Sequence, residues 1–170
     1  MKLTFFLSLL LLITGCATSY MPPTTGGKTV DYVQIKDDRF GWAGLYLGMT
    51  REEAERQLGM TLTPVPDGYP GCGNWSSEFQ LQERKVILQW SSNEPTATIE
   101  SVQANLPANE LNTSHQSMAD TLVKRFSGLK SLSSDEDSAE LITTGNSRQV
   151  ILVKNNREHF LLVTYNACMD

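Results

Sequence analysis

The sequence predicts an α+β fold in which two short helices pack on one face of an antiparallel sheet. The same order, one helix followed by three strands, occurs twice, at about residues 45–106 and 112–168. The strands are joined by connections of only a few residues, whereas parallel neighbours need a crossover of a dozen residues or more, so antiparallel hairpins are expected. The length of 170 residues suits one globular domain or two very small ones.

The first fifteen residues have the pattern of a signal peptide. Lys2 supplies a positive charge, and the apolar run 3–13 is too short to cross about 30 Å of hydrocarbon. The next residues, Ile13-Thr14-Gly15-Cys16, resemble the lipobox of bacterial lipoproteins. This resemblance implies cleavage before Cys16 and acyl chains on that cysteine, which anchor the chain to a membrane. An ordinary signal peptide, or a small buried cysteine after an apolar helix, is the alternative.

The residue after the cysteine indicates which membrane is used. Ala17 stands where lipoproteins retained in the inner membrane have Asp, so the resemblance implies an outer-membrane lipoprotein that faces the periplasm. Residues 16–29 are rich in Pro, Gly, Thr and Ser, which predicts a flexible tether. The globular domain is then expected over residues 30–170, where 30–36 either adds a strand or docks on the domain.

The first helix has start and stop signals in the sequence. Thr50 is the expected N-cap, Glu53 completes a capping box, and Gly59 offers the left-handed conformation that ends a helix. Apolar alternation then predicts three strands, at residues 75–82, 85–90 and 97–106.

The second helix is expected over residues 114–127, because Met118, Leu122 and Phe126 recur at every fourth position. Three strands are expected after it, at residues 139–144, 149–154 and 159–166. Between this helix and its first strand, Asp135-Glu136-Asp137 suits a solvated loop, and the alternatives are a weak Ca²⁺ site or a site for a basic partner.

Residues 44–59, GLYLGMTREEAERQLG, resemble the "GMT, charged helix, LG" signature of two related groups. One group is the SmpA/OmlA lipoproteins of the outer-membrane protein assembly machinery, and the other is the β-lactamase inhibitory protein (BLIP-like) group. The resemblance implies short helices on antiparallel strands, a unit that the inhibitor group repeats in tandem, and a helix-free sheet face that grips the target. Residues 112–115, NTSH, lack this signature, so the second repeat rests on pattern alone.

The cysteine count predicts one disulfide. With Cys16 assigned to lipid, Cys72 and Cys168 remain in a chain that is exported to an oxidising compartment. A metal site or a reactive thiol is the alternative, but neither cysteine has a second Cys or a His at ligand spacing.

Composition and motifs argue against several functional classes. A net charge of −5 is unfavourable for binding nucleic acid, which needs clustered Lys and Arg. None of the common hydrolase, metalloprotease, P-loop, dinucleotide-binding or EF-hand motifs occurs. His115 and His159 are the only histidines, and neither lies among acids or thiols at metal spacing. We therefore expect no catalytic residue, no metal ion and no cofactor.

Five aromatic residues are candidates for a protein interface, although the core is the alternative position for each. Aromatic side chains are common anchors in protein interfaces. If Trp75 and Phe79 point away from the helices, they form a concave aromatic surface. The five candidates are Trp42, Tyr46, Trp75, Phe79 and Trp90.

The leading hypothesis is a non-enzymatic outer-membrane lipoprotein that binds another envelope protein as an assembly or stabilising accessory. The alternative is an inhibitor or immunity-type lipoprotein that blocks a periplasmic or incoming hydrolase through its sheet face. A small enzyme or ligand binder is the third hypothesis, and it requires a deep polar pocket around His115 or His159.

Overall fold

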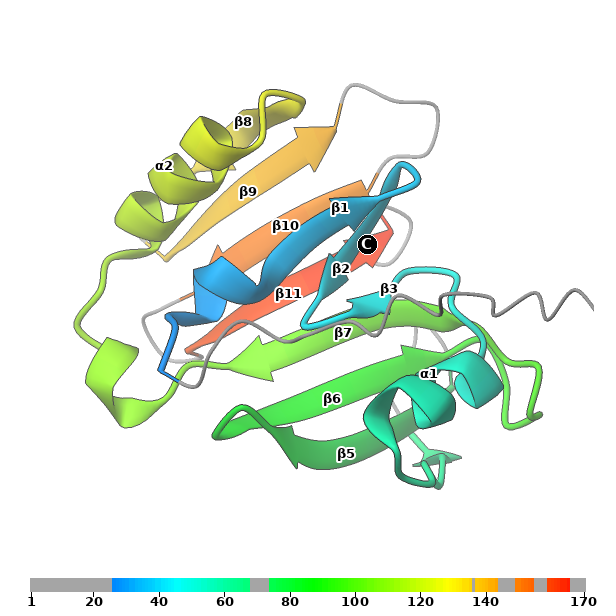
Figure 1. Ribbon diagram of the computed structural model, residues 1–170. Coiled ribbons are helices and arrows are strands. Elements are labelled where there is room, and N and C mark those ends of the chain that lie inside the picture. Colours follow the sequence, from blue (N-terminus) through cyan, green and yellow to red (C-terminus); the bar gives the residue numbers. More distant parts are fainter. Residues whose placement is uncertain (1–25, 68–73, 136, 144–148, 155–158, 166–170) are drawn as a thin grey trace, which may run out of the picture.

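The predicted α+β class is confirmed by the computed structural model, which describes residues 26–67, 74–135, 137–143, 149–154 and 159–165. Eight strands form one antiparallel sheet in the order β4-β5-β6-β7-β11-β10-β9-β8, and three more form a small sheet, β1-β2-β3. Figure 1 shows the two helices and the small sheet on the same side of the large sheet. The elements are η1 (Thr29–Tyr32), β1 (Val33–Lys36), β2 (Arg39–Trp42), β3 (Leu45–Tyr46), α1 (Arg51–Leu58), β4 (Val65–Pro66), β5 (Trp75–Leu81), β6 (Arg84–Trp90), β7 (Ile99–Asn105), η2 (Ala108–Glu110), α2 (His115–Arg125), β8 (Leu129–Ser134), β9 (Ser138–Thr143), β10 (Gln149–Lys154) and β11 (Phe160–Tyr165).

Helix α1 begins and ends where its capping signals predict. The Thr50 hydroxyl accepts a hydrogen bond from the backbone N–H of Glu53 at 3.2 Å. The Glu53 carboxylate accepts one from the Thr50 N–H at 2.9 Å, which completes the capping box. Gly59 adopts φ +67° and ends the helix. Only Ala54 of this helix is fully buried, so the caps matter for a helix of two turns.

We expect Thr50→Ala to lower the free energy of unfolding by about 1 kcal/mol, because the Glu53 N–H loses its acceptor. Chemical denaturation followed by circular dichroism measures this change. Thr61→Ala is the matched control, since Thr61 is exposed in the loop after the helix. Equal losses for the two variants would contradict the capping role.

A tight two-residue loop joins β5 to β6 and reverses the chain direction. Gln82 and Glu83 both have positive φ, at 53° and 62°, which is the backbone of the turn that matches strand twist. Along β6, alternate residues are buried, and Val86, Leu88 and Trp90 share the covered side as their spacing predicts. Backbone pairing places β5, β6 and β7 side by side in the first half of the sheet.

The second half contains a strand that the sequence did not predict. β8 lies between α2 and β9, so four strands rather than three follow α2. Its residues LKSLSS are exposed after Leu129 and show no apolar alternation, which is why a loop was expected. Backbone pairing with β9 forms the strand regardless of its side chains. One residue is inserted in β8 between Ser131 and Ser133, which makes a β-bulge.

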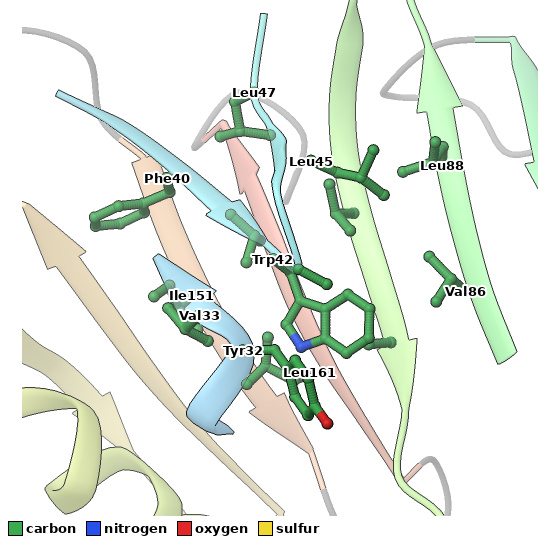
Figure 2. Packing of buried hydrophobic residues seen from close by; sticks show 14 of the residues in the cluster. Tyr32, Val33, Phe40, Trp42, Leu45, Leu47, Val86, Leu88, Ile151 and Leu161 are labelled. Carbon is green, nitrogen blue, oxygen red and sulfur yellow. The ribbon is translucent and has the colours of Figure 1, made fainter. Parts of the chain in front are cut away.

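The small sheet β1-β2-β3 covers the middle of the large sheet. Its side chains Val33, Phe40 and Trp42 are fully buried. Figure 2 shows Trp42 toward Leu161 and Val86 of the large sheet, and Val33 and Phe40 toward Ile151. The sequence predicted only its first strand. The strands within residues 39–46 were not predicted, because they are very short and nearly all of their residues are buried. Such strands lack the alternation of apolar and polar residues that identifies a half-buried strand.

The side chain of Gln149 joins the small sheet to the large sheet through two hydrogen bonds. The Gln149 Oε1 accepts a hydrogen bond from the Phe40 N–H at 2.5 Å, and its Nε2 donates to the Asp38 carbonyl at 2.6 Å. Gln149 is 2% exposed, so these bonds satisfy a buried amide. The amide thereby ties the start of β10 to the β1–β2 turn.

The packed part of the chain begins earlier than the predicted tether boundary. Thr29, expected in the tether, is fully buried, and its N–H donates to the Glu110 carboxylate at 2.8 Å. Arg84 forms an ion pair of 2.6 Å with Glu110 and donates to the Gly27 carbonyl at 2.6 Å. The physical reason for the correction is this buried polar cluster, which a composition-based boundary does not reveal.

Candidate functional site

The predicted interface aromatics lie mainly in the core. Trp42 and Trp90 are fully buried, and Phe79 is 8% exposed. The Trp42 indole N–H donates to the Thr29 carbonyl at 2.9 Å, and that of Trp90 donates to the Ser77 hydroxyl at 3.0 Å. These three residues are therefore not a surface that a partner could contact, because the covering layer and satisfied hydrogen bonds hold them inside.

Of the other two predicted aromatics, Trp75 faces the covered side of the large sheet, whereas Tyr46 stands opposite Gly41 and so lies on the outer side of the small sheet, away from Trp42. Trp75 stands opposite Trp90 in the β5–β6 ladder, and opposite residues of a pair point to the same side. It is half-buried against the core. The Tyr46 hydroxyl donates to Gln34 at 2.8 Å, and burial raises its pKa although nearby Arg39 lowers it. A concave aromatic surface made by Trp75 and Phe79 is therefore wrong, since both share the side of Trp90.

The side of the large sheet that faces away from the helices carries the candidate site. None of the described helices or strands covers this side in Figure 1, and we call it the open face. Its middle row crosses five neighbouring strands, because the ladder registers align the residues. In the order β6, β7, β11, β10 and β9, the row is Ile87, Gln103, Leu162, Leu152 and Glu140.

Apolar side chains gather on one half of the open face, over β11, β10 and β9. Leu162 and Leu152 are cross-strand partners, Phe160 lies two residues from Leu162 along β11, and Ile142 lies two residues from Glu140 along β9. All four apolar side chains are half-buried, although no described helix or strand lies above them. We name Ile142, Leu152, Phe160 and Leu162 the apolar patch.

The other half of the open face is polar and amide-rich. The Ser101 hydroxyl donates to Gln89 at 2.7 Å, and the Gln103 amide donates to Asn105 at 3.0 Å. These amides are half-buried and already hydrogen-bonded to neighbours on the same face. The arrangement offers a flat, neutral border to the apolar patch.

Charges of both signs occur on the open face. Lys85 and Glu78 form an exposed ion pair of 2.8 Å. Glu140 stands opposite Leu152 in the middle row, and Lys154 lies two residues from Leu152 along β10. The face is therefore close to electrical balance although the whole chain carries −5. A partner need not be strongly basic to bind here.

Neither histidine lines the pocket over η1 and α2. The His115 Nε2 lies 2.9 Å from the Asp135 carbonyl, which links the start of α2 to the end of β8. The His159 Nδ1 is buried and has no hydrogen-bond partner among the described residues.

The acidic run after β8 forms part of a turn. The Asp135 carboxylate accepts backbone N–H bonds from Asp137 at 2.8 Å and Ser138 at 2.7 Å, and these lower its pKa. Glu136 lies outside the described residues. Over the described part of the chain, no group of three or more His, Cys, Asp or Glu side chains could hold a metal ion.

All three cysteines lie outside the described residues. The positions of the described strand ends nearest to Cys72 and Cys168 are known. Trp75 begins β5 and Tyr165 ends β11, and the ladders through β6 and β7 put both at the same end of the sheet. They are three strands apart, a separation of about 14 Å at the usual strand spacing.

The comparisons with known proteins return no relative. No family model, no curated protein and no solved structure matches the chain. Among the described residues, no helix is both long enough and apolar enough to span a bilayer.

Proposed function

We propose that the protein is a non-enzymatic, lipid-anchored accessory that faces the periplasm from the outer membrane and binds another envelope protein through its open face. The anchor rests on the lipobox at Cys16. The single observation that carries the binding proposal is the apolar patch, which no described element covers. An apolar centre inside a polar border is the usual anatomy of a protein interface.

The sheet order supports the proposal that the domain is a tandem repeat. Each unit is one helix followed by four strands, α1 with β4 to β7 and α2 with β8 to β11. The last strands of the units, β7 and β11, pair at the centre of the sheet, and the first strands, β4 and β8, lie at its edges. This order is what two copies related by a two-fold axis would give, with four strands per unit instead of the expected three.

The dimensions of the open face suit a protein partner better than a small ligand. Eight strands at the usual spacing of about 4.8 Å make the sheet roughly 34 Å wide. A square patch of about 800 Å², the usual area per partner in a standard interface, is roughly 28 Å on each edge and therefore fits within this width. Small ligands instead favour concave pockets, and the open face is built from a sheet with in-register rows.

Leu152→Lys is expected to lower recovery of the partner by about tenfold or more, because it puts a charge at the centre of the apolar patch. The measurement is site-specific photocross-linking in intact envelopes, with the probe placed on the open face. Met60→Lys is the matched control, since Met60 is 42% exposed in the loop after α1. Thermal melting of both variants shows whether each remains folded.

Equal losses for the two lysine variants would contradict binding through the open face. If no protein were recovered specifically from open-face positions under any growth condition, the accessory function would be wrong. Recovery of a hydrolase whose activity falls on binding would favour the inhibitor or immunity-type alternative, which the resemblance of residues 44–59 to the BLIP-like group also suggests.

A further inference from the structure

Strand β8 is an edge of the large sheet with an unused side. It pairs with β9 and with no other described strand, and Figure 1 shows it beyond β9, beside α2. An edge strand presents unpaired N–H and C=O groups that can pair with another chain. The outer side of β8 is therefore a ready template for an added strand.

The two edges of the large sheet differ in how well they are protected. At the other edge, β4 has only two residues, and one of them is Pro66. β8 has six residues, with no proline, no acidic residue and a single charge at Lys130. Leu132 in β8 is 59% exposed, the largest exposure among the big apolar side chains described. Short length and proline block an edge, and β8 has neither; its protective features are one lysine, Lys130, and the bulge.

The bulge in β8 gives its side chains a symmetric pattern. Leu129 is buried on the helix side, and Ser134 also faces that side because its hydroxyl donates to Gln116 of α2. Lys130 and Ser133 face the open side, since they pair with Ile142 and Glu140. The sides of these four residues therefore read the same from either end of the strand, about a midpoint between Ser131 and Leu132.

We propose that β8 pairs antiparallel with β8 of a second copy of this chain, which joins two sheets into one. Residues that stand opposite in an antiparallel pair must point to the same side. A two-fold axis at the midpoint meets this condition, because it sets Leu129 opposite Ser134 and Lys130 opposite Ser133. In a regular six-residue strand, a two-fold axis at the midpoint would set residues that point to opposite sides against each other. The bulge in β8 shifts the alternation by one residue, so that the opposed residues can point to the same side.

Charge favours a second copy as the occupant. The axis places Lys130 beside Ser133 of the second copy, whose hydroxyl contacts Glu140 of its own chain at 3.3 Å. Lys130 of each copy can therefore reach the Glu140 carboxylate of the other, and the two ion pairs form by symmetry. No like charges stand opposite each other along the paired strands, although each chain carries −5 overall.

The pairing also covers the exposed leucine. Leu132 lies beside the midpoint, so the two leucines approach each other across the axis. An interface made from two edge strands is small and belongs to the weak, concentration-dependent class. The paired strands adjoin the apolar patch, because Lys130 stands opposite Ile142, but the backbone pairing does not use the patch. The dimer therefore does not depend on the proposed function, and lipid anchoring would only raise the local concentration.

Cysteine cross-linking of the full chain in bacterial envelopes tests the dimer. We expect Leu132→Cys to form a covalent dimer on mild oxidation, in yield several times that of Val65→Cys. Val65 is the matched control, since it is 53% exposed on the opposite edge, in β4. The unsubstituted chain measures any background from its own cysteines.

Charge variants in the Leu132→Cys background separate this dimer from random collision. Lys130→Glu is expected to lower the yield about two- to fivefold, as loss of exposed ion pairs does. Adding Glu140→Lys should restore the yield, because the charges are then exchanged. Equal yields for Leu132→Cys and Val65→Cys, or no restoration by the exchanged pair in variants that melt normally, would overturn the proposal.

Discussion

Arg84→Met is expected to lower the free energy of unfolding by about 3–5 kcal/mol, because it leaves the Glu110 carboxylate buried without its cation. Arg84 and Glu110 are each 5% exposed. The Arg84 Nε also donates to the Thr29 hydroxyl at 2.7 Å, and its guanidinium lies 5.0 Å from the centre of the Tyr32 ring. One substitution therefore removes the partner of several buried groups at once.

Chemical denaturation at neutral pH measures this loss. Lys85→Met is the matched control, because the neighbouring Lys85–Glu78 ion pair is exposed and is expected to contribute less than about 1 kcal/mol. Combining Arg84→Met with Glu110→Gln should recover part of the stability, since no buried charge is then left unpaired. If Arg84→Met were no more damaging than Lys85→Met, the buried cluster would not stabilise the start of the domain.

Cys72→Ser is expected to lower the free energy of unfolding by about 2–5 kcal/mol, because it removes the predicted disulfide with Cys168. That bridge would close a long loop and thereby reduce the entropy of the unfolded chain. The described neighbours Trp75 and Tyr165 lie at one end of the sheet, about 14 Å apart, and three residues on each side can reach across that separation.

Denaturation under oxidising and reducing conditions measures the contribution of the bridge. Reduction should destabilise the unsubstituted chain to the level of Cys72→Ser and leave the variant unchanged. Peptide mass spectrometry without reduction identifies the linked pair directly. Two free thiols in the mature chain, or an effect of reduction on Cys72→Ser, would show that the pairing is wrong.

Short-range signals predicted the local elements well. The capping box of Thr50 and Glu53 and the left-handed Gly59 set both ends of α1, because each signal acts within one helical turn. The β10 bounds were predicted as observed, and the predicted start of β6 was one residue late. Alternation identified these strands because each has one buried and one less buried side.

The missed elements depend on contacts distant in sequence. β8 forms by backbone pairing to β9, and its exposed serines give no apolar period. β2 is held by β1 and by the Gln149 side chain, more than a hundred residues away. Each strand is held by contacts with another segment of the chain, so the propensity and periodicity of a short segment could not predict β8 or β2.

The sequence by itself determined the α+β class, both helices, six of the strands and the grouping of Val86, Leu88 and Trp90 on one side. Only the tertiary structure decided which side was covered. Strand alternation states that residues share a side, but the choice of inner side depends on where the small sheet and the helices pack. That packing put Trp42, Phe79 and Trp90 in the core and left Leu152 and Leu162 on the open face. The tryptophans Trp42 and Trp90 lie inside because their burial removes the largest apolar area from water, and the candidate site consists of smaller apolar side chains.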